Sequence, residues 1–160
     1  MIAALLISCM AMLPTQYPTR LHYAVHQVET SGEVTPPQIG AAGERGPLQI
    51  TRAAWLDTRR DGERFEDVDT LEYSIVIFDR YMARYATERR LGRKPTDKDK
   101  CDIWNGGPRG PWATGRKRER LDAYWAKIKK HIAPREVVSE GDGIHQPQVK
   151  MPTAYHGGEQ

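Results

Sequence analysis

The feature that most constrains the fold is an apolar stripe between residues 67 and 90. Its apolar residues recur at spacings of four, three, four and three, which places them on one face of a helix, with Arg and Glu residues opposite. These positions are Leu71, Ile75, Phe78, Met82 and Tyr85. A helix of this kind is stabilised mainly by packing its apolar face against other elements. The stripe therefore predicts a long helix in the core of a helical domain.

Four shorter segments also carry helical signals. Residues 19–29 hold a short apolar stripe, and Gly32 just beyond it is a plausible stop. Thr51 is placed to cap a short helix through "RAAWLDTRR", and Thr96 with Asp99 resembles a capping box that starts another helix. A last helix is marked by Leu121, Trp125, Ile128 and Ile132. The sequence thus predicts a mainly helical chain.

Glycine and proline divide the chain into three parts. Residues 1–14 form an apolar leader, residues 15–133 form one domain, and residues 134–160 form a polar, Gly- and Pro-rich tail that we expect to be flexible. Residues 30–47 are predicted to be an ordered loop, and residues 33–50 could hold at most a small β-hairpin. The leader is compatible with either a signal-like segment or a first helix, which leaves export open.

The bulk composition narrows the classes of partner. A net charge of +3 and 39% apolar residues suit a soluble domain that binds an anionic polymer, either nucleic acid or cell wall. Cys9 and Cys101 have no metal-ligand spacing, so we expect no metal and no cofactor. No segment reaches the roughly 18 to 20 apolar residues of a membrane-spanning helix, so no stable span is expected. We also expect a monomer.

Glu29 is the strongest candidate for a catalytic residue. It lies in the last turn predicted for its helix, where the negative end of the helix dipole disfavours ionisation. Burial beside Val25, Val28 and Leu48 would raise its pKa further. A carboxyl group with a raised pKa is suited to protonating a glycosidic oxygen near neutral pH. The alternative is an ordinary solvated glutamate at a helix end.

Four further side chains could line a binding site for a sugar. Gln49 follows the tight "RGP" bend and presents an amide. Trp104 offers a flat face on which a sugar ring can stack, and Asn105 offers a donor and an acceptor. Tyr124 leaves the last helix beside Trp125 and could point its hydroxyl into a cleft. Each of these residues also has a purely structural interpretation, as part of a turn, a helix end or the core.

Four motifs, "ETSG" from Glu29, "GERGPLQI" from Gly43, "WNGG" from Trp104 and "YWAKI" from Tyr124, follow one another along the chain. In this order they resemble the lytic transglycosylase family, which shares the lysozyme-like fold with goose-type lysozymes. The resemblance covers about residues 20 to 130. It implies a lysozyme-like α+β domain without a cofactor.

The resemblance also implies roles for individual residues. Glu29 matches the catalytic acid, and the substrate-binding positions it matches are Ser31, Gln49, Trp104, Asn105 and Tyr124. Two departures matter: Thr30 stands where the family usually has serine, and Trp104 replaces a tyrosine. Glu33, Glu44 and Asp57 are the nearby carboxylates, and none stands out as a second catalyst. Glu33 and Glu44 are expected to face solvent.

The implied activity is cleavage of the β-1,4 bond between N-acetylmuramic acid and N-acetylglucosamine in peptidoglycan. A lytic transglycosylase would leave a 1,6-anhydro sugar, whereas a lysozyme would leave a reducing end. A non-catalytic peptidoglycan-binding module is a further alternative. Glycan strands are the expected partner, and nucleic acid is not, because no nucleic-acid-binding motif accompanies the basic "RKRER" run. Such a protein would act in the cell envelope or periplasm, be secreted, or be delivered to the wall by a phage.

Overall fold

The computed structural model describes residues 16–132, and both the predicted leader and the predicted tail lie outside this part. Helices account for nearly all of the regular structure within it. They are α1 (Arg20–Thr30), α2 (Arg52–Thr58), the 3₁₀ helix η1 (Phe65–Asp69), α3 (Leu71–Tyr85), α4 (Glu88–Leu91), α5 (Asp97–Gly106), the 3₁₀ helix η2 (Gly110–Trp112) and α6 (Gly115–Ile132). The prediction of a mainly α fold is confirmed. In place of a hairpin, the loop before α2 forms two isolated bridges, Ile39–Arg45 and Arg45–Ile50.

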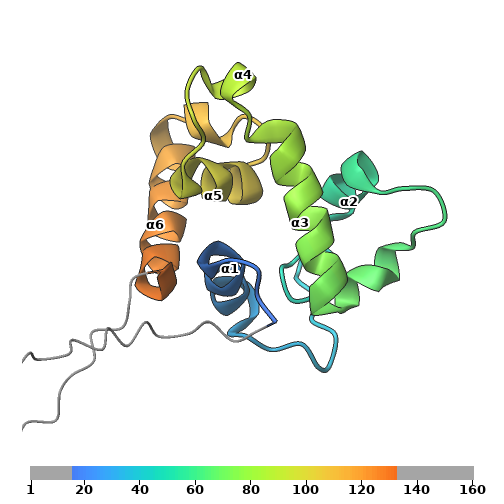
Figure 1. Ribbon diagram of the computed structural model, residues 1–160. Coiled ribbons are helices and arrows are strands. Elements are labelled where there is room, and N and C mark those ends of the chain that lie inside the picture. Colours follow the sequence, from blue (N-terminus) through green and yellow to red (C-terminus); the bar gives the residue numbers. More distant parts are fainter. Residues whose placement is uncertain (1–15, 133–160) are drawn as a thin grey trace, which may run out of the picture.

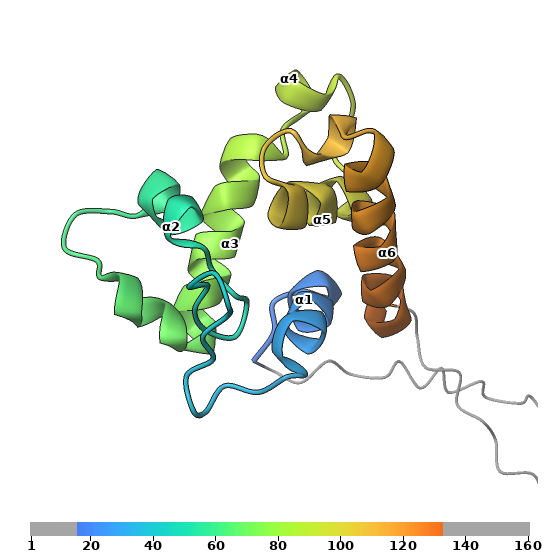
Figure 2. The same ribbon diagram turned by 180° about the vertical axis from the view of Figure 1, so that it is seen from behind.

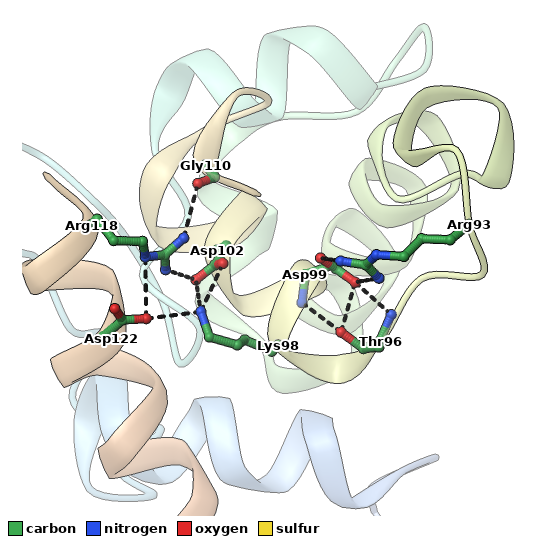
Figure 3. Close-up of polar contacts among 8 residues, drawn as sticks. All are labelled: Arg93, Thr96, Lys98, Asp99, Asp102, Gly110, Arg118 and Asp122. Atoms are coloured by element: carbon green, nitrogen blue, oxygen red, sulfur yellow. Dashed lines mark hydrogen bonds and ion pairs between the residues drawn. The ribbon is translucent and has the colours of Figure 1, made fainter. Parts of the chain in front are cut away.

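Threonine residues explain where five of the helices begin. Thr19, Thr51, Thr70, Thr87 and Thr96 precede α1 to α5, and each side-chain oxygen accepts a hydrogen bond from a backbone N–H of the first turn. These bonds satisfy donors that have no partner inside the helix. The predicted capping box of α5 is also confirmed, since its Asp side chain accepts a return bond from the Thr96 N–H at 2.8 Å (Figure 3).

The long helix expected between residues 67 and 90 is divided into three pieces, η1, α3 and α4. Thr70 has extended backbone angles and separates η1 from α3, and Ala86, with φ −95° and ψ 63°, ends α3. The prediction of one continuous helix was therefore wrong at both ends. The prediction that its apolar stripe faces the core is nevertheless confirmed, because four of its residues are buried there: Leu71, Ile75, Phe78 and Met82.

The helices pack into two groups that meet along α3. On one side α6 packs against α1 and α5, and on the other side α2 and η1 pack against α3 (Figures 1 and 2). The loop between α1 and α2 also reaches the core, since Leu48 and Ile50 are fully buried. This loop is thus an ordered part of the domain, as predicted, and it joins the two groups.

A cluster of charges fixes α5 on α6 (Figure 3). The buried Asp102 of α5 lies 2.6 Å from Arg118 Nη2 and 3.1 Å from Lys98 Nζ. Asp122 of α6 contacts the same two cations, at 3.1 Å from Arg118 Nε and 2.9 Å from Lys98 Nζ. Because Asp102, the buried charge of the cluster, has a cation from each of the two helices beside it, the cluster favours one relative placement of α5 and α6.

Candidate functional site

Glu29 and Tyr124 meet between α1 and α6. The Tyr124 hydroxyl donates a hydrogen bond to Glu29 Oε1 at 2.7 Å, although the residues are 95 positions apart in the chain. Burial raises the pKa of Glu29 to about 7, while the bond from Tyr124 acts to lower it. More distant charges add smaller effects: Glu44 raises this pKa and Lys127 lowers it. The site therefore holds an acid that titrates near neutral pH.

Tyr124 is a suitable permanent donor for this carboxyl group. Its own pKa is raised well above the ordinary value by burial, and the neighbouring Glu29 raises it further. The phenol consequently keeps its proton throughout the pH range in which Glu29 titrates. The hydrogen bond orients one carboxyl oxygen, which leaves the other available to a ligand.

The turn that follows Gly46 is attached directly to the end of α1. The Thr30 hydroxyl lies 3.1 Å from the Pro47 carbonyl oxygen, so the threonine that follows Glu29 can donate to the turn. Gln49 has a positive φ of 50°, and its side-chain Nε2 donates to the Gly46 carbonyl at 3.0 Å. A second contact, to the carbonyl of Gln38, is 3.4 Å long. The amide nitrogen thus holds the turn, and the side-chain oxygen is left for a ligand.

Two cavities join to form an elongated cleft. The first, of about 390 Å³, is lined by Glu29 together with residues of the loop before α2 and the end of α5. The second, of about 700 Å³, continues along α2 and α3 as far as Asp57. The two share four residues, Gln49, Thr51, Trp104 and Asn105. An open cleft made of two adjoining cavities suits a chain of sugar rings better than a single small ligand.

Trp104 forms a rigid wall of the cleft. Its ring packs against Phe78 and Tyr81, with ring centroids 4.8 and 5.9 Å apart. The indole is half-buried, so one part is held by the core while another part faces the cavities. Asn105 follows it and is exposed. A fixed, partly exposed aromatic ring is a suitable platform for stacking a sugar.

Four of the six predicted site residues therefore line the cleft, and Tyr124 lies behind Glu29 and contacts it. Ser31 does not line either cavity. It is an exposed left-handed residue, with φ 58°, that caps the end of α1 through a bond from its N–H to the Gln27 carbonyl at 3.1 Å. Ser31 thus ends the helix, and its role in substrate binding stays a prediction.

Glu44 is the main residue that sequence reasoning missed. It was expected to face solvent, but it is half-buried and lines the same cavity as Glu29. One of its oxygens accepts a hydrogen bond from the Ala42 N–H at 3.1 Å, while Glu33, the other nearby glutamate, is exposed as predicted. No local pattern marks Glu44, because its position depends on how the loop around Gly40 folds back on it.

Residues 16–132 were also compared with the requirements of a metal site, a reactive cysteine and a membrane-spanning helix. No group of three or more His, Cys, Asp and Glu residues in this part is placed to hold a metal ion. Cys101 is buried, and burial raises the pKa of its thiol well above the ordinary range, so it stays protonated. Nor is any helix in the described part long and apolar enough to cross a membrane.

No family model matches the chain, and no curated protein matches it. Solved structures of lysozymes do match. The crystal structure of Tapes japonica lysozyme has a TM-score of 0.60 at 18% identity, over 78% of this chain and 98% of that one. A chain of the complex of Aeromonas hydrophila PliI with Meretrix lusoria lysozyme has a TM-score of 0.58 at 21% identity, over 74% and 93% of the two chains.

A third match is the inhibitor-bound lysozyme of Meretrix lusoria, with a TM-score of 0.58 at 21% identity, over 72% of this chain and 90% of that one. The described domain therefore has a lysozyme-like fold, similar to that of invertebrate lysozymes. Identities this low establish the fold alone. The more specific resemblance to lytic transglycosylases stays a prediction.

Proposed function

We propose that this protein cleaves the β-1,4 bond between N-acetylmuramic acid and N-acetylglucosamine in peptidoglycan, with Glu29 as the general acid. The observation that carries the proposal is the half-buried carboxyl group of Glu29, which lines the cleft, is held by Tyr124 and has its pKa raised to about 7 by burial. A protonated carboxyl group near pH 7 can donate to the leaving glycosidic oxygen. The lysozyme-like fold supports a glycosidase of this class.

In the proposed first step, Glu29 gives its proton to the glycosidic oxygen as the bond to the anomeric carbon breaks. The carbonyl oxygen of the substrate's own N-acetyl group attacks that carbon and forms a cyclic oxazolinium ion. Glu29 is now a carboxylate and can act as a base in the second step. Tyr124 donates to the Glu29 carboxyl group and acts as a positioning residue in both steps.

Two kinds of product can leave this intermediate. If Glu29 takes the proton of the C6 hydroxyl, O6 attacks the anomeric carbon and a 1,6-anhydro sugar forms, which is the transglycosylase route that we propose. If a carboxylate instead takes a proton from water, the product is a reducing end. Glu44 is a specific reason to keep this second route, because it shares the cavity with Glu29 and could hold that water.

Mass spectrometry of the muropeptides released from purified sacculi tests the proposal. We expect products with 1,6-anhydro ends, and reducing ends would assign the protein to the lysozymes. Binding to pelleted sacculi without any release would contradict both routes and indicate a binding module. The assay is best run below pH 7, where Glu29 is protonated.

Tyr124→Phe is expected to move the basic limb of the pH profile upward. The hydrogen bond from Tyr124 favours the ionised form of Glu29, so its removal raises the pKa of Glu29 above about 7. The acid then stays protonated to a higher pH, although the less well oriented carboxyl group lowers the maximal rate. The measurement is kcat/KM as a function of pH, which reports the pKa of the free enzyme.

Glu44→Gln is the control, because it is expected to move the basic limb of the pH profile in the opposite direction. The negative charge of Glu44 raises the pKa of Glu29, so its neutralisation moves the basic limb to lower pH. If the limb does not respond to either substitution, a group other than Glu29 controls the pH dependence. A large loss of rate in Glu44→Gln at every pH would in addition favour the hydrolytic route.

A further inference from the structure

Arginine residues gather at the end of the cleft that is remote from Glu29. A third pocket, of about 450 Å³, is lined by Asp57, Thr58, Arg59, Arg80, Ala83 and Arg84. Asp57 also lines the 700 Å³ cavity, so the two hollows adjoin at this residue. We call this pocket the arginine pocket. A polymer lying in the cleft would therefore pass its mouth.

The guanidinium groups of Arg59, Arg80 and Arg84 differ in how many of their N–H donors already bind other protein groups. Arg80 Nη1 contacts Glu63 Oε2 at 2.8 Å and the Thr58 carbonyl at 3.4 Å, so this group is occupied. Arg84 is more than half exposed and shares Asp57 with the hydroxyl of Tyr85.

Arg59 is the guanidinium with most capacity left for a ligand. It is exposed and lies over the Trp55 ring, 5.2 Å from the ring centroid. Within residues 16–132 no carboxylate lies within ion-pair distance of it. Stacking on an aromatic face leaves the edge of a guanidinium, with its N–H donors, directed elsewhere. Arg84 donates to the Asp57 carbonyl through Nη1 at 3.1 Å and lies 3.3 Å from its carboxylate through Nη2, so Arg59 is the group that offers free donors at a pocket beside the cleft.

We propose that the arginine pocket binds a carboxylate of the peptide stem carried by muramic acid residues of the glycan strand. This inference rests on the proposed function, because it requires a strand in the cleft. The stem branches sideways from the sugar chain and carries free carboxylates at neutral pH. A guanidinium binds a carboxylate through two parallel hydrogen bonds, so Arg59 is suited to this ligand.

The test compares two soluble substrates, both free of phosphate-containing wall polymers. One is glycan strands with their peptide stems, and the other is the same strands after an amidase has removed the stems. Arg59→Ser is expected to raise KM roughly tenfold on the first substrate and to leave KM on the second unchanged. The value of kcat is expected to stay close to wild type on both, since Arg59 is remote from Glu29.

Arg52→Ser is the matched control. Arg52 is the first residue of α2, and Arg59 caps the other end of this helix. Arg52 is likewise exposed and lies over two aromatic rings, 5.8 Å from the Trp55 ring centroid and 5.4 Å from that of Phe65, but it does not line the arginine pocket. The Arg52→Ser substitution removes the same charge from the same region of the surface. An equal rise in KM for both variants on the stem-bearing strands would therefore overturn the proposal. A rise in KM for Arg59→Ser on both substrates, or on neither, would also overturn the proposal.

If the proposed peptidoglycan-cleaving function is wrong, the results differ from those that would overturn the arginine pocket alone. In that case the wild-type protein would release nothing from either substrate. Pelleting with intact and with stem-free sacculi then still tests the arginine pocket, because Arg59→Ser should weaken binding only to the intact form. Equal binding of wild type and variant to intact sacculi would overturn the inference independently of catalysis.

Discussion

Glu29→Gln is expected to lower kcat on peptidoglycan by about 10²- to 10⁴-fold, the usual contribution of a positioned general acid. The amide has nearly the shape of the carboxyl group and can still accept the hydrogen bond from Tyr124, which is 2.7 Å from Oε1 in the wild-type protein. It has no proton to give to the leaving oxygen. The measurement is the initial rate of release of soluble muropeptides below pH 7, where the wild-type acid is protonated.

The same substitution should change stability in a way that depends on pH. The pKa of Glu29 rises from an ordinary value of 4.5 to about 7 on folding, so between these values the folded state binds more protons than the unfolded state. Stability therefore falls as pH rises through this window. Gln cannot ionise, so Glu29→Gln is expected to raise the melting temperature at pH 8 to 9 but not at pH 4.

These two readouts separate a catalytic defect from misfolding. A variant that is inactive yet more stable at alkaline pH has lost its acid and kept its fold. Glu33→Gln is the matched control, because Glu33 is an exposed glutamate only four residues away and should change neither property. A Glu29→Gln enzyme that keeps most of the wild-type rate would contradict the assignment of Glu29 as the acid.

Local signals in the sequence predicted the elements that depend on neighbouring residues. The caps at Thr51 and Thr96 and the buried stripe of α3 follow from side chains within a few positions of one another. The resemblance to lytic transglycosylases assigned Glu29 and Tyr124 to one site, and a hydrogen bond between α1 and α6 joins the two side chains. That contact spans most of the described domain, so no local pattern could have predicted it.

The parts that were missed depend on contacts between distant segments. The loop that carries Glu44 is anchored by Arg45, which makes paired hydrogen bonds to Asp69 of η1, one of them 3.1 Å long. The position of Glu44 depends on this anchor and on the loop around Gly40 that folds back on it, so it cannot be deduced from the neighbouring sequence. The same holds for Asp57, whose position at the junction of two pockets requires α2 to pack on α3.

Gly46→Ala is expected to destabilise the protein by about 3 kcal/mol or more, a loss typical of severe strain at a buried position. Gly46 has a φ of 75°, which an alanine adopts only with strain. A Cβ atom there would also lie 1.8 Å from the Val68 carbonyl oxygen. That oxygen is held in place because it accepts a hydrogen bond from the buried Ser74 hydroxyl at 2.7 Å, so the backbone cannot easily move away.

Gly43→Ala separates the strain of a positive φ from the clash with the Val68 carbonyl, the two causes of the loss expected for Gly46→Ala. Gly43 has a similar φ of 85°, but a Cβ atom built on it meets nothing within 4 Å. It should therefore cost only the strain of a left-handed residue, about 1 to 2 kcal/mol. The free energies of unfolding of both variants can be measured by urea denaturation. Equal losses would show that the close approach of Gly46 to Val68 adds nothing to the strain of φ, whereas a larger loss for Gly46→Ala would show that the turn bearing Gln49 lies too close to Val68 to admit a side chain.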